Sequence, residues 1–142
     1  MTGNRVLLIV TGLLAIAALA YLRDPEWLIR VESGFRGWET GSDGARYRWT
    51  DGHASFFVRS DASAIDVPIR TSVATPSDIP VTVTLTIDDR PADRLVLNDG
   101  GWHRVKVQLP PRGARRVRRL DIRVDRTKDG NRGVQVGEVQ VR

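Results

Sequence analysis

Hydrophobic and polar residues alternate almost without error over residues 80–88, in the sequence PVTVTLTID. An extended chain would place three threonines on one face and four apolar residues on the other, namely Val81, Val83, Leu85 and Ile87. Threonine retains strand propensity without exposing a large apolar surface. The pattern therefore predicts a half-buried strand, around which the rest of the chain is organised.

Shorter alternating stretches flank this strand and predict further strands at residues 27–31, 45–50, 53–59, 65–73, 94–97, 102–109, 116–125 and 133–141. Asp51-Gly52 lies between two of them and is a two-residue hairpin signal. Pro68 places its strand at a sheet edge or a bulge, because proline cannot donate a ladder hydrogen bond. Gly137 marks a change of phase typical of a bulge. Glycines interrupt residues 32–44, so Phe35 and Trp38 are expected on irregular backbone.

The N-terminal segment has a different character, because residues 6–22 are apolar or small and carry no charge. Its length lies between that of a membrane-spanning helix and a signal-peptide core. Tyr21 and Trp27 flank its end, where aromatic residues suit a bilayer interface, which favours an uncleaved transmembrane anchor over a signal peptide. We therefore expect an anchor at 1–22, a connector with a first strand at 23–44, and an extracytoplasmic β-sandwich at 45–142, at the cell surface or in the periplasm.

The fold class predicted by these patterns is all-β, an antiparallel β-sandwich of jelly-roll type preceded by one N-terminal transmembrane helix. The chain has 142 residues, enough for one such domain and its anchor. It contains no cysteine, which excludes a disulfide, a thiolate metal site and a catalytic cysteine.

The net charge is +5, from 22 basic and 17 acidic residues that are interleaved along the chain. Basic residues are densest over residues 112–128, where anionic lipid headgroups, an acidic polysaccharide or nucleic acid are conceivable partners. Only alternate residues of a strand share a face, so a solvated ladder of opposite charges is the favoured interpretation. Nucleic acid binding is not expected, because such proteins normally cluster their charge on one face.

Several short segments follow one another in an order that suggests a family: Gly34-Phe35, Gly37-Trp38-Glu39, Arg48-Trp49-Thr50, Asp88-Asp89-Arg90, Gly101-Trp102 and residues 133–139. This order resembles that of small jelly-roll modules, similar to the galactose-binding-like and carbohydrate-binding-like β-sandwiches of bacterial membrane-associated proteins. The resemblance covers roughly residues 31–142. It implies a β-sandwich with a surface for a glycan or a partner, and it implies no catalysis.

Sugar recognition needs an aromatic face with planar polar side chains at its rim. The residues that we expect to bind a ligand are Trp38, Glu39, Arg48, Trp49 and Trp102. Tyr47 is a further aromatic candidate, and His53 and Gln135 are further rim candidates. Two alternatives stay open: Trp49 and Trp102 as core residues, and a Glu39–Arg48 ion pair that pins the entry segment to the following strand.

The sequence offers little for an enzyme. Asp88 and Asp89 are adjacent in a turn rather than separated as in a glycosidase, and the two histidines, His53 and His103, lack a metal-type spacing. No cofactor is expected, although a structural Ca²⁺ would have Asp43, Asp51 and Asp129 as candidate ligands. We therefore expect a non-enzymatic, membrane-anchored module that binds a cell-envelope glycan, or alternatively a structural subunit that docks a membrane protein partner.

Overall fold

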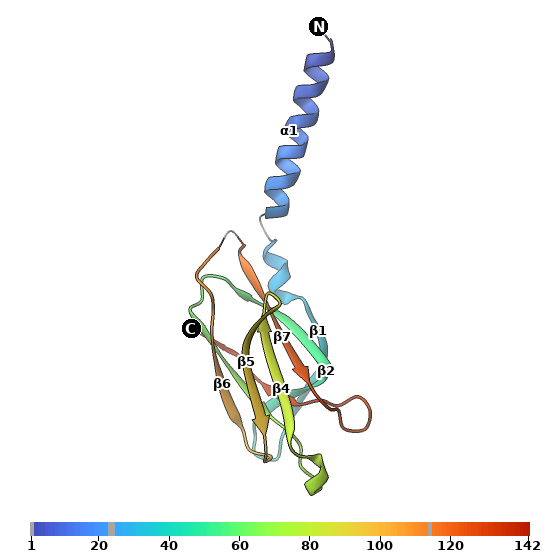
Figure 1. Cartoon of the computed structure of the whole chain (residues 1–142), viewed down its shortest axis with the longest axis vertical. Helices are drawn as coiled ribbons and strands as arrows, with labels where there is room; N and C mark the ends of the chain where they lie inside the picture. Colours follow the sequence, from blue (N-terminus) through green and yellow to red (C-terminus); the bar gives the residue numbers. More distant parts are fainter. Residues whose placement is uncertain (1, 23–24, 114) are drawn as a thin grey trace.

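The computed structural model describes residues 2–22, 25–113 and 115–142. Helix α1 (Thr2–Leu22) precedes two short 3₁₀ helices, η1 (Glu26–Arg30) and η2 (Pro76–Asp78). The strands of the described residues are β1 (Glu32–Thr40), β2 (Arg46–Arg59), β3 (Ala64–Arg70), β4 (Val81–Ile87), β5 (Arg90–Leu97), β6 (His103–Gln108), β7 (Val117–Val124), β8 (Gln135–Gly137) and β9 (Gln140–Val141). Figure 1 shows α1 projecting from one end of the β domain.

Strand β4 confirms the prediction from residues 80–88. Its valines, leucine and isoleucine are all buried, whereas its threonines are half-buried on the opposite face. It pairs with β5 on one side and β7 on the other, both antiparallel. The two-residue turn into β5 places Asp88 and Asp89 at positive φ, a conformation that aspartate tolerates better than most residues.

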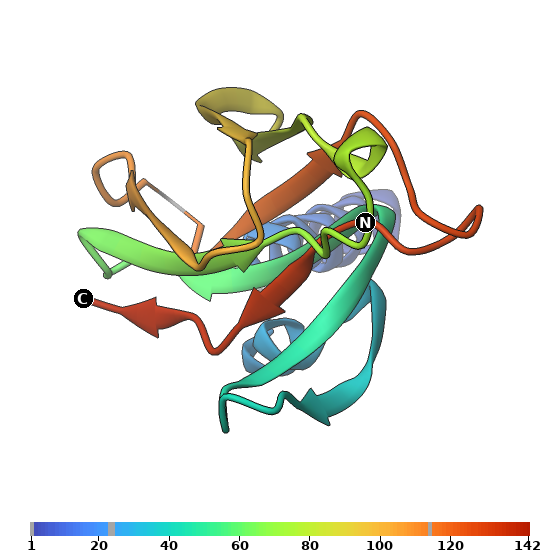
Figure 2. The same ribbon diagram turned by 90° about the horizontal axis from the view of Figure 1, so that it is seen from below.

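The strands are joined in the order β5-β4-β7-β2-β8-β3-β6, with β1 paired to β2 and β9 paired to β3. The long strand β2 connects two layers, because residues 53–59 pair with β7 whereas residues 47–49 pair with β8. Figure 2, viewed from below, shows the resulting curvature of the sheet around its interior. The predicted antiparallel β-sandwich is therefore confirmed, and its two layers are continuous through β2.

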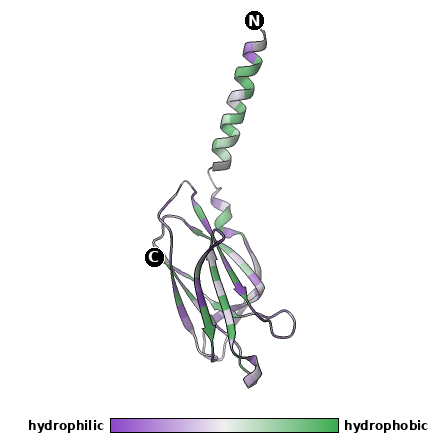
Figure 3. Cartoon of the chain, in the orientation of Figure 1, coloured by the Kyte–Doolittle hydropathy of each residue, from purple (hydrophilic) through white to green (hydrophobic). Residues whose placement is uncertain are grey.

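The interior is filled by apolar side chains from both layers, which pack without any contribution from α1. The fully buried ones include Ile65, Val67, Ile69, Val83, Leu85, Leu97, Leu120, Ile122, Val134 and Val136. In the hydropathy colouring of Figure 3, apolar and polar residues alternate along the strands, whereas α1 is apolar along most of its length.

The predicted hairpin at Asp51-Gly52 was wrong, and so was the sheet-edge alternative for the strand that contains Pro68. Asp51-Gly52 does not form a hairpin, since both residues lie within β2 at the point where its partner changes from β8 to β7. Pro68 does not lie on an edge strand, since β3 runs between β6 and β8. On the edge of β3 that faces away from β6, residues 65–66 pair with β9 and residues 69–70 pair with β8. Pro68 lies between these two paired stretches, so its missing N–H removes no hydrogen bond from either of them.

The entry to the domain also differs from expectation. Residues 27–31, predicted as the first strand, mainly form η1, and the first strand is instead β1. Phe35 and Trp38 consequently lie on a strand rather than on irregular backbone. The glycines do not end β1; the irregularity appears as register shifts between Ser33 and Phe35 and between Phe35 and Trp38.

The predicted transmembrane helix is not supported. Among the helices of residues 2–22, 25–113 and 115–142, none is both long enough and apolar enough to cross a membrane.

Candidate functional site

A hollow of about 460 Å³ lies on the outer surface of the layer formed by β2, β8, β3 and β6. We call it the outer hollow; the lining residues on which its chemistry depends are Arg46, Pro68, Trp102, Arg104, Gly137 and Glu138. Trp102 directly precedes β6, and the other residues come from β2, β3, β6, β8 and the turn after β8. Residues far apart in the sequence therefore meet around one aromatic ring.

Two residues without long side chains keep the outer hollow open. Pro68 faces outward because its neighbours Val67 and Ile69 point into the core, where both are fully buried. Gly137 lies beside it, and a Cβ at this position would stand 3.2 Å from Cβ of Pro68 and 3.6 Å from Cζ3 of Trp102. A side chain at this position would therefore crowd Pro68 and fill the space beside the indole.

The indole of Trp102 is held by polar contacts on its other sides. Its Nε1–H donates a hydrogen bond to Oδ2 of Asp43 over 3.3 Å. The guanidinium carbon of Arg70 lies 4.4 Å from the ring centroid, a cation–π contact. Arg70 also donates a hydrogen bond to Asp43 over 2.9 Å, so the three side chains form a closed set that fixes the ring.

Asp43 is ionised in this arrangement. The backbone N–H of Ala45 lowers the pKa of Asp43 most, and the indole N–H of Trp102 and the charge of Arg70 lower it further. An ionised carboxylate accepts these hydrogen bonds more strongly than a neutral one would. At neutral pH Asp43 is therefore a charged acceptor for the indole N–H of Trp102 and for Arg70.

The rim of the outer hollow carries planar polar groups. Arg46 and Glu138 approach within 3.5 Å of each other, and both side chains are more than half exposed. Arg104 extends from β6 on the same lining. Guanidinium and carboxylate groups can form paired hydrogen bonds with neighbouring hydroxyls, while an aromatic ring packs on the apolar face of a sugar. The outer hollow thus combines both features that were expected of a glycan site.

Among the residues predicted to bind a ligand, Trp102 borders the outer hollow and Trp38 lies next to it. Trp38 is 41% exposed on β1, and the guanidinium carbons of Arg46 and Arg48 lie 4.9 and 4.8 Å from its ring centroid. Arg46 therefore contacts Trp38 and lines the outer hollow at the same time.

The suggested Glu39–Arg48 ion pair is wrong. Arg48 is buried and pairs with Glu32 at 2.5 Å, with its guanidinium carbon 3.8 Å from the ring centroid of Phe35. Glu39 instead accepts a hydrogen bond from the hydroxyl of Tyr47 over 3.2 Å. The pairing of β1 with β2 decides this outcome, because it sets Glu39 opposite Tyr47 and Trp38 opposite Arg48.

Trp49 lies away from the outer hollow. Only 6% of its surface is exposed, and it borders a smaller pocket of about 120 Å³ between the β3–β4 connection and the segment after β7. Its ring meets that of Tyr47 edge-on, with 6.3 Å between centroids. This placement agrees with the alternative interpretation of Trp49 as a core residue.

The sequence did not indicate the supporting residues Asp43, Arg70 and Arg46. Two unusual features of the sequence do, however, belong to the lining of the outer hollow. They are the proline within a predicted strand, Pro68, and the glycine at the change of phase, Gly137. Both were interpreted as features of strand pairing. In the structure they are also the positions at which the outer face lacks bulky side chains.

The histidines and two of the three suggested calcium ligands, Asp43 and Asp51, have other partners. His53 pairs with Asp121 at 2.9 Å and His103 with Asp99 at 3.0 Å. Asp51 pairs with Arg36 at 3.5 Å, and Asp43 holds Trp102. Within the described ranges no group of three or more potential metal-ligating side chains is found.

No family model and no curated protein matches this chain. Similar solved structures include the family two carbohydrate esterase from Clostridium thermocellum in complex with cellohexaose (TM-score 0.50, 11% identity, 78% of this chain and 30% of that chain). A family two carbohydrate esterase from Cellvibrio japonicus gives a TM-score of 0.49 at 14% identity, covering 76% of this chain and 29% of that one. A family 35 carbohydrate binding module from Clostridium thermocellum gives 0.49 at 13% identity, covering 78% and 89%.

This chain thus spans less than a third of the two esterases. At these sequence identities a structural similarity is evidence of a shared fold alone, and the esterase from Clostridium thermocellum provides that evidence. The chain shares the jelly-roll β-sandwich fold with part of the esterase from Clostridium thermocellum, and this is the fold that the resemblance noted from the sequence implies.

Proposed function

We propose that this protein is a non-enzymatic glycan-binding module, in which the outer hollow binds a cell-envelope glycan and α1 attaches the module to a membrane on its extracytoplasmic side. The single observation that carries the proposal is the fixed, partly exposed indole of Trp102 beside an open hollow with a polar rim. Such a combination provides both stacking and directional hydrogen bonds for a pyranose.

The other predicted residues take supporting roles in this proposal. Trp38 extends the aromatic surface through Arg46, whereas Arg48 supports the ring of Trp38 from the buried side. Glu39 orients Tyr47, whose ring centroid lies 6.5 Å from that of Trp102. The fold similarity to an esterase solved with cellohexaose makes a saccharide the first ligand class to test.

Membrane attachment is proposed from the surface of α1. The large apolar side chains between residues 6 and 19 are 47–72% exposed, and the sandwich core is complete without them. An apolar helix that is exposed all round requires another apolar environment to cover it. Lipid provides that environment, and attachment there is compatible with a glycan ligand at the cell envelope.

The glycan site is tested by a glycan array on the purified full chain, followed by calorimetric titration of the best ligand. Trp102→Ala should weaken binding at least tenfold, because it removes the stacking surface. Trp27→Ala is the matched control, since it removes an equally large ring that lies outside the outer hollow and is 62% exposed. Unchanged circular dichroism in both variants establishes that the fold is retained.

Equal affinity of the Trp102→Ala variant and the parent would refute the outer hollow as the site. No saturable binding by the folded chain to any glycan would favour the docking subunit instead. Burial of all four tryptophans together with an apolar patch near the membrane-proximal end would favour such a subunit. Trp27 and Trp38 are exposed and only Trp49 of the four is buried, whereas Ile29 and Val31 are exposed beside Trp27.

Attachment through α1 is tested by flotation of the full chain with phosphatidylcholine vesicles. Leu7→Asp combined with Leu14→Asp should abolish flotation, because two charges would enter the apolar environment. Val73→Asp, at a 40% exposed position of the sandwich, should not. Flotation of the double variant would contradict the proposal, and protease accessibility in intact cells would test the side of the membrane.

A further inference from the structure

A second hollow, of about 440 Å³, lies at the end of the sandwich where the chain enters from α1. Residues of η1 form one wall, and the end of β2 with the segment before β7 forms the other. We call this region the helix-proximal surface and define it by Trp27, Arg30, Arg59, Arg112 and Arg116. It lies outside the outer hollow and has no role in the glycan site.

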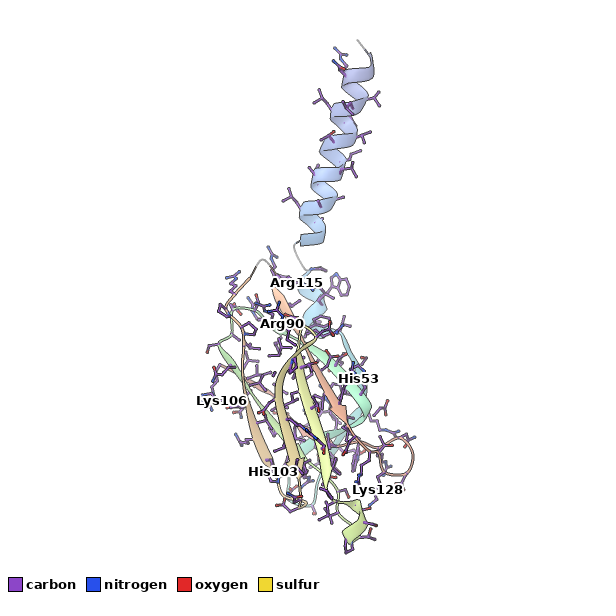
Figure 4. The ribbon with its side chains drawn as sticks, in the orientation of Figure 1. His53, Arg90, His103, Lys106, Arg115 and Lys128 are labelled. Atoms are coloured by element: carbon purple, nitrogen blue, oxygen red, sulfur yellow. The ribbon has the colours of Figure 1, made fainter. Side chains whose placement is uncertain are left out.

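The charge of the helix-proximal surface is predominantly positive. Its lining contains four exposed arginines against two carboxylates, those of Glu26 and Asp61. Asp61 already pairs with Arg59 at 3.3 Å. Arg30 and Arg116 form no ion pair with a described residue, so their charges are available to a partner. Figure 4 shows Arg115 at this same end of the domain, whereas His103 and Lys128 lie toward the opposite end.

The basic run that the sequence showed over residues 112–128 is therefore divided by the fold. Arg118 pairs with Asp88 at 2.9 Å, and Arg119 lies between Asp121, at 2.9 Å, and Asp89. These arginines are paired with opposite charges, but the expected solvated ladder is wrong at Asp121, which is buried. Arg112 and Arg116 instead line the helix-proximal surface, together with arginines from η1 and β2.

Apolar side chains accompany the arginines. Trp27 is 62% exposed, Ile29 41% and Val31 40%. Since Trp27 is the fifth residue after Leu22, where α1 ends, the chain cannot place it more than about 18 Å from that end. Exposed tryptophan beside arginine is the combination that suits the headgroup region of a bilayer.

We propose that the helix-proximal surface binds the phosphate headgroups of an anionic bilayer, with Trp27 at the lipid interface and the arginines on the phosphates. The proposal rests on the proposed attachment through α1, which places this surface next to the bilayer. It adds a preference for anionic lipid, which an apolar helix by itself does not provide. Each arginine near an anionic surface contributes roughly a fivefold increase in affinity.

The test compares the full chain bound to vesicles of phosphatidylcholine alone with the full chain bound to vesicles that also contain 30% phosphatidylglycerol. The bound protein is collected by flotation, and amide hydrogen exchange is then measured at residues 25–31 and 109–117. We expect exchange in these segments to be at least fivefold slower on the anionic vesicles at low salt. The difference should disappear in 0.5 M NaCl, because salt screens exposed charges.

Arg112→Gln combined with Arg116→Gln should remove the slowing on anionic vesicles. Arg94→Gln combined with Arg123→Gln is the matched control; it removes the same charge from exposed positions on β5 and β7, away from this surface, and should leave the slowing unchanged. Equal exchange on both vesicle types would overturn the proposal, as would slowing that survives in the Arg112/Arg116 variant.

Slowing by soluble polyphosphate without vesicles would also overturn it, in favour of an anionic polymer as the partner. Failure of attachment through α1 gives a different result, namely no flotation with phosphatidylcholine alone.

Discussion

The hydroxyl of Thr50 connects β2 to the segment that leads into β8. Thr50 is fully buried, and its Oγ1 accepts a hydrogen bond from the N–H of Val134 over 3.0 Å and donates one to the Val134 carbonyl over 3.2 Å. Thr50→Val preserves the shape of the side chain and removes the hydroxyl. The Val134 carbonyl would keep the backbone N–H of Thr50, at 2.8 Å, but the N–H of Val134 would be left without a partner.

The expected loss of stability follows from that one group. A buried N–H without a hydrogen bond costs about 1–3 kcal/mol, and the added methyl group returns about 0.8 kcal/mol through burial. Thr50→Val should therefore lower the free energy of unfolding by about 1 kcal/mol, within a range of about 0.2–2 kcal/mol. Urea denaturation of the full chain, followed by circular dichroism, measures this difference, and the slope of the transition should not change.

Thr84→Val is the control, because Thr84 lies half-buried on the outer face of β4 and its side chain forms no hydrogen bond with the described residues. It should change stability by less than about 0.5 kcal/mol. A Thr50→Val protein as stable as the parent would refute the assignment of the Thr50 hydroxyl as the partner of the Val134 N–H.

Three further predictions concern other parts of the fold. Backbone N–H groups of Thr75 and Ala74 lower the pKa of Asp78 from 3.8 to about 2, so its ionised form stabilises the fold fully above pH 3.8 and progressively less as the pH falls to 2. Asp78→Asn should therefore be destabilising at pH 7 and neutral near pH 2 in urea denaturation; an equal effect at both pH values would contradict this. Gly34→Ala should prevent normal pairing of β1, because Gly34 has φ +70° and a Cβ there would overlap the backbone of β2; an unchanged thermal transition would contradict it. Ile65→Ala should cost about 2–5 kcal/mol in denaturant titrations, because Ile65 is fully buried; a loss below 1 kcal/mol would show that the core collapses around the site.

Sequence reasoning succeeded where the structure depends on local periodicity. The alternation in β4 is confirmed residue by residue, because burial on one face of a strand requires a period of two whatever the neighbouring strands are. In β7 the same rule placed Leu120 and Ile122 inside correctly. For the site, the sequence singled out Trp102, Trp38 and Trp49 by residue type; Trp102 lines the outer hollow, Trp38 contacts its lining residue Arg46, and Trp49 is buried elsewhere.

The sequence by itself thus determined the class of fold and the inward face of the main strands. Only the tertiary structure decided that β2 continues through Asp51-Gly52, because its partners change there. Only the register of β1 decided that Arg48 pairs with Glu32 rather than Glu39. Partner exchange, register shifts and ion-pair choice depend on residues distant in sequence, and a local pattern carries no record of those residues.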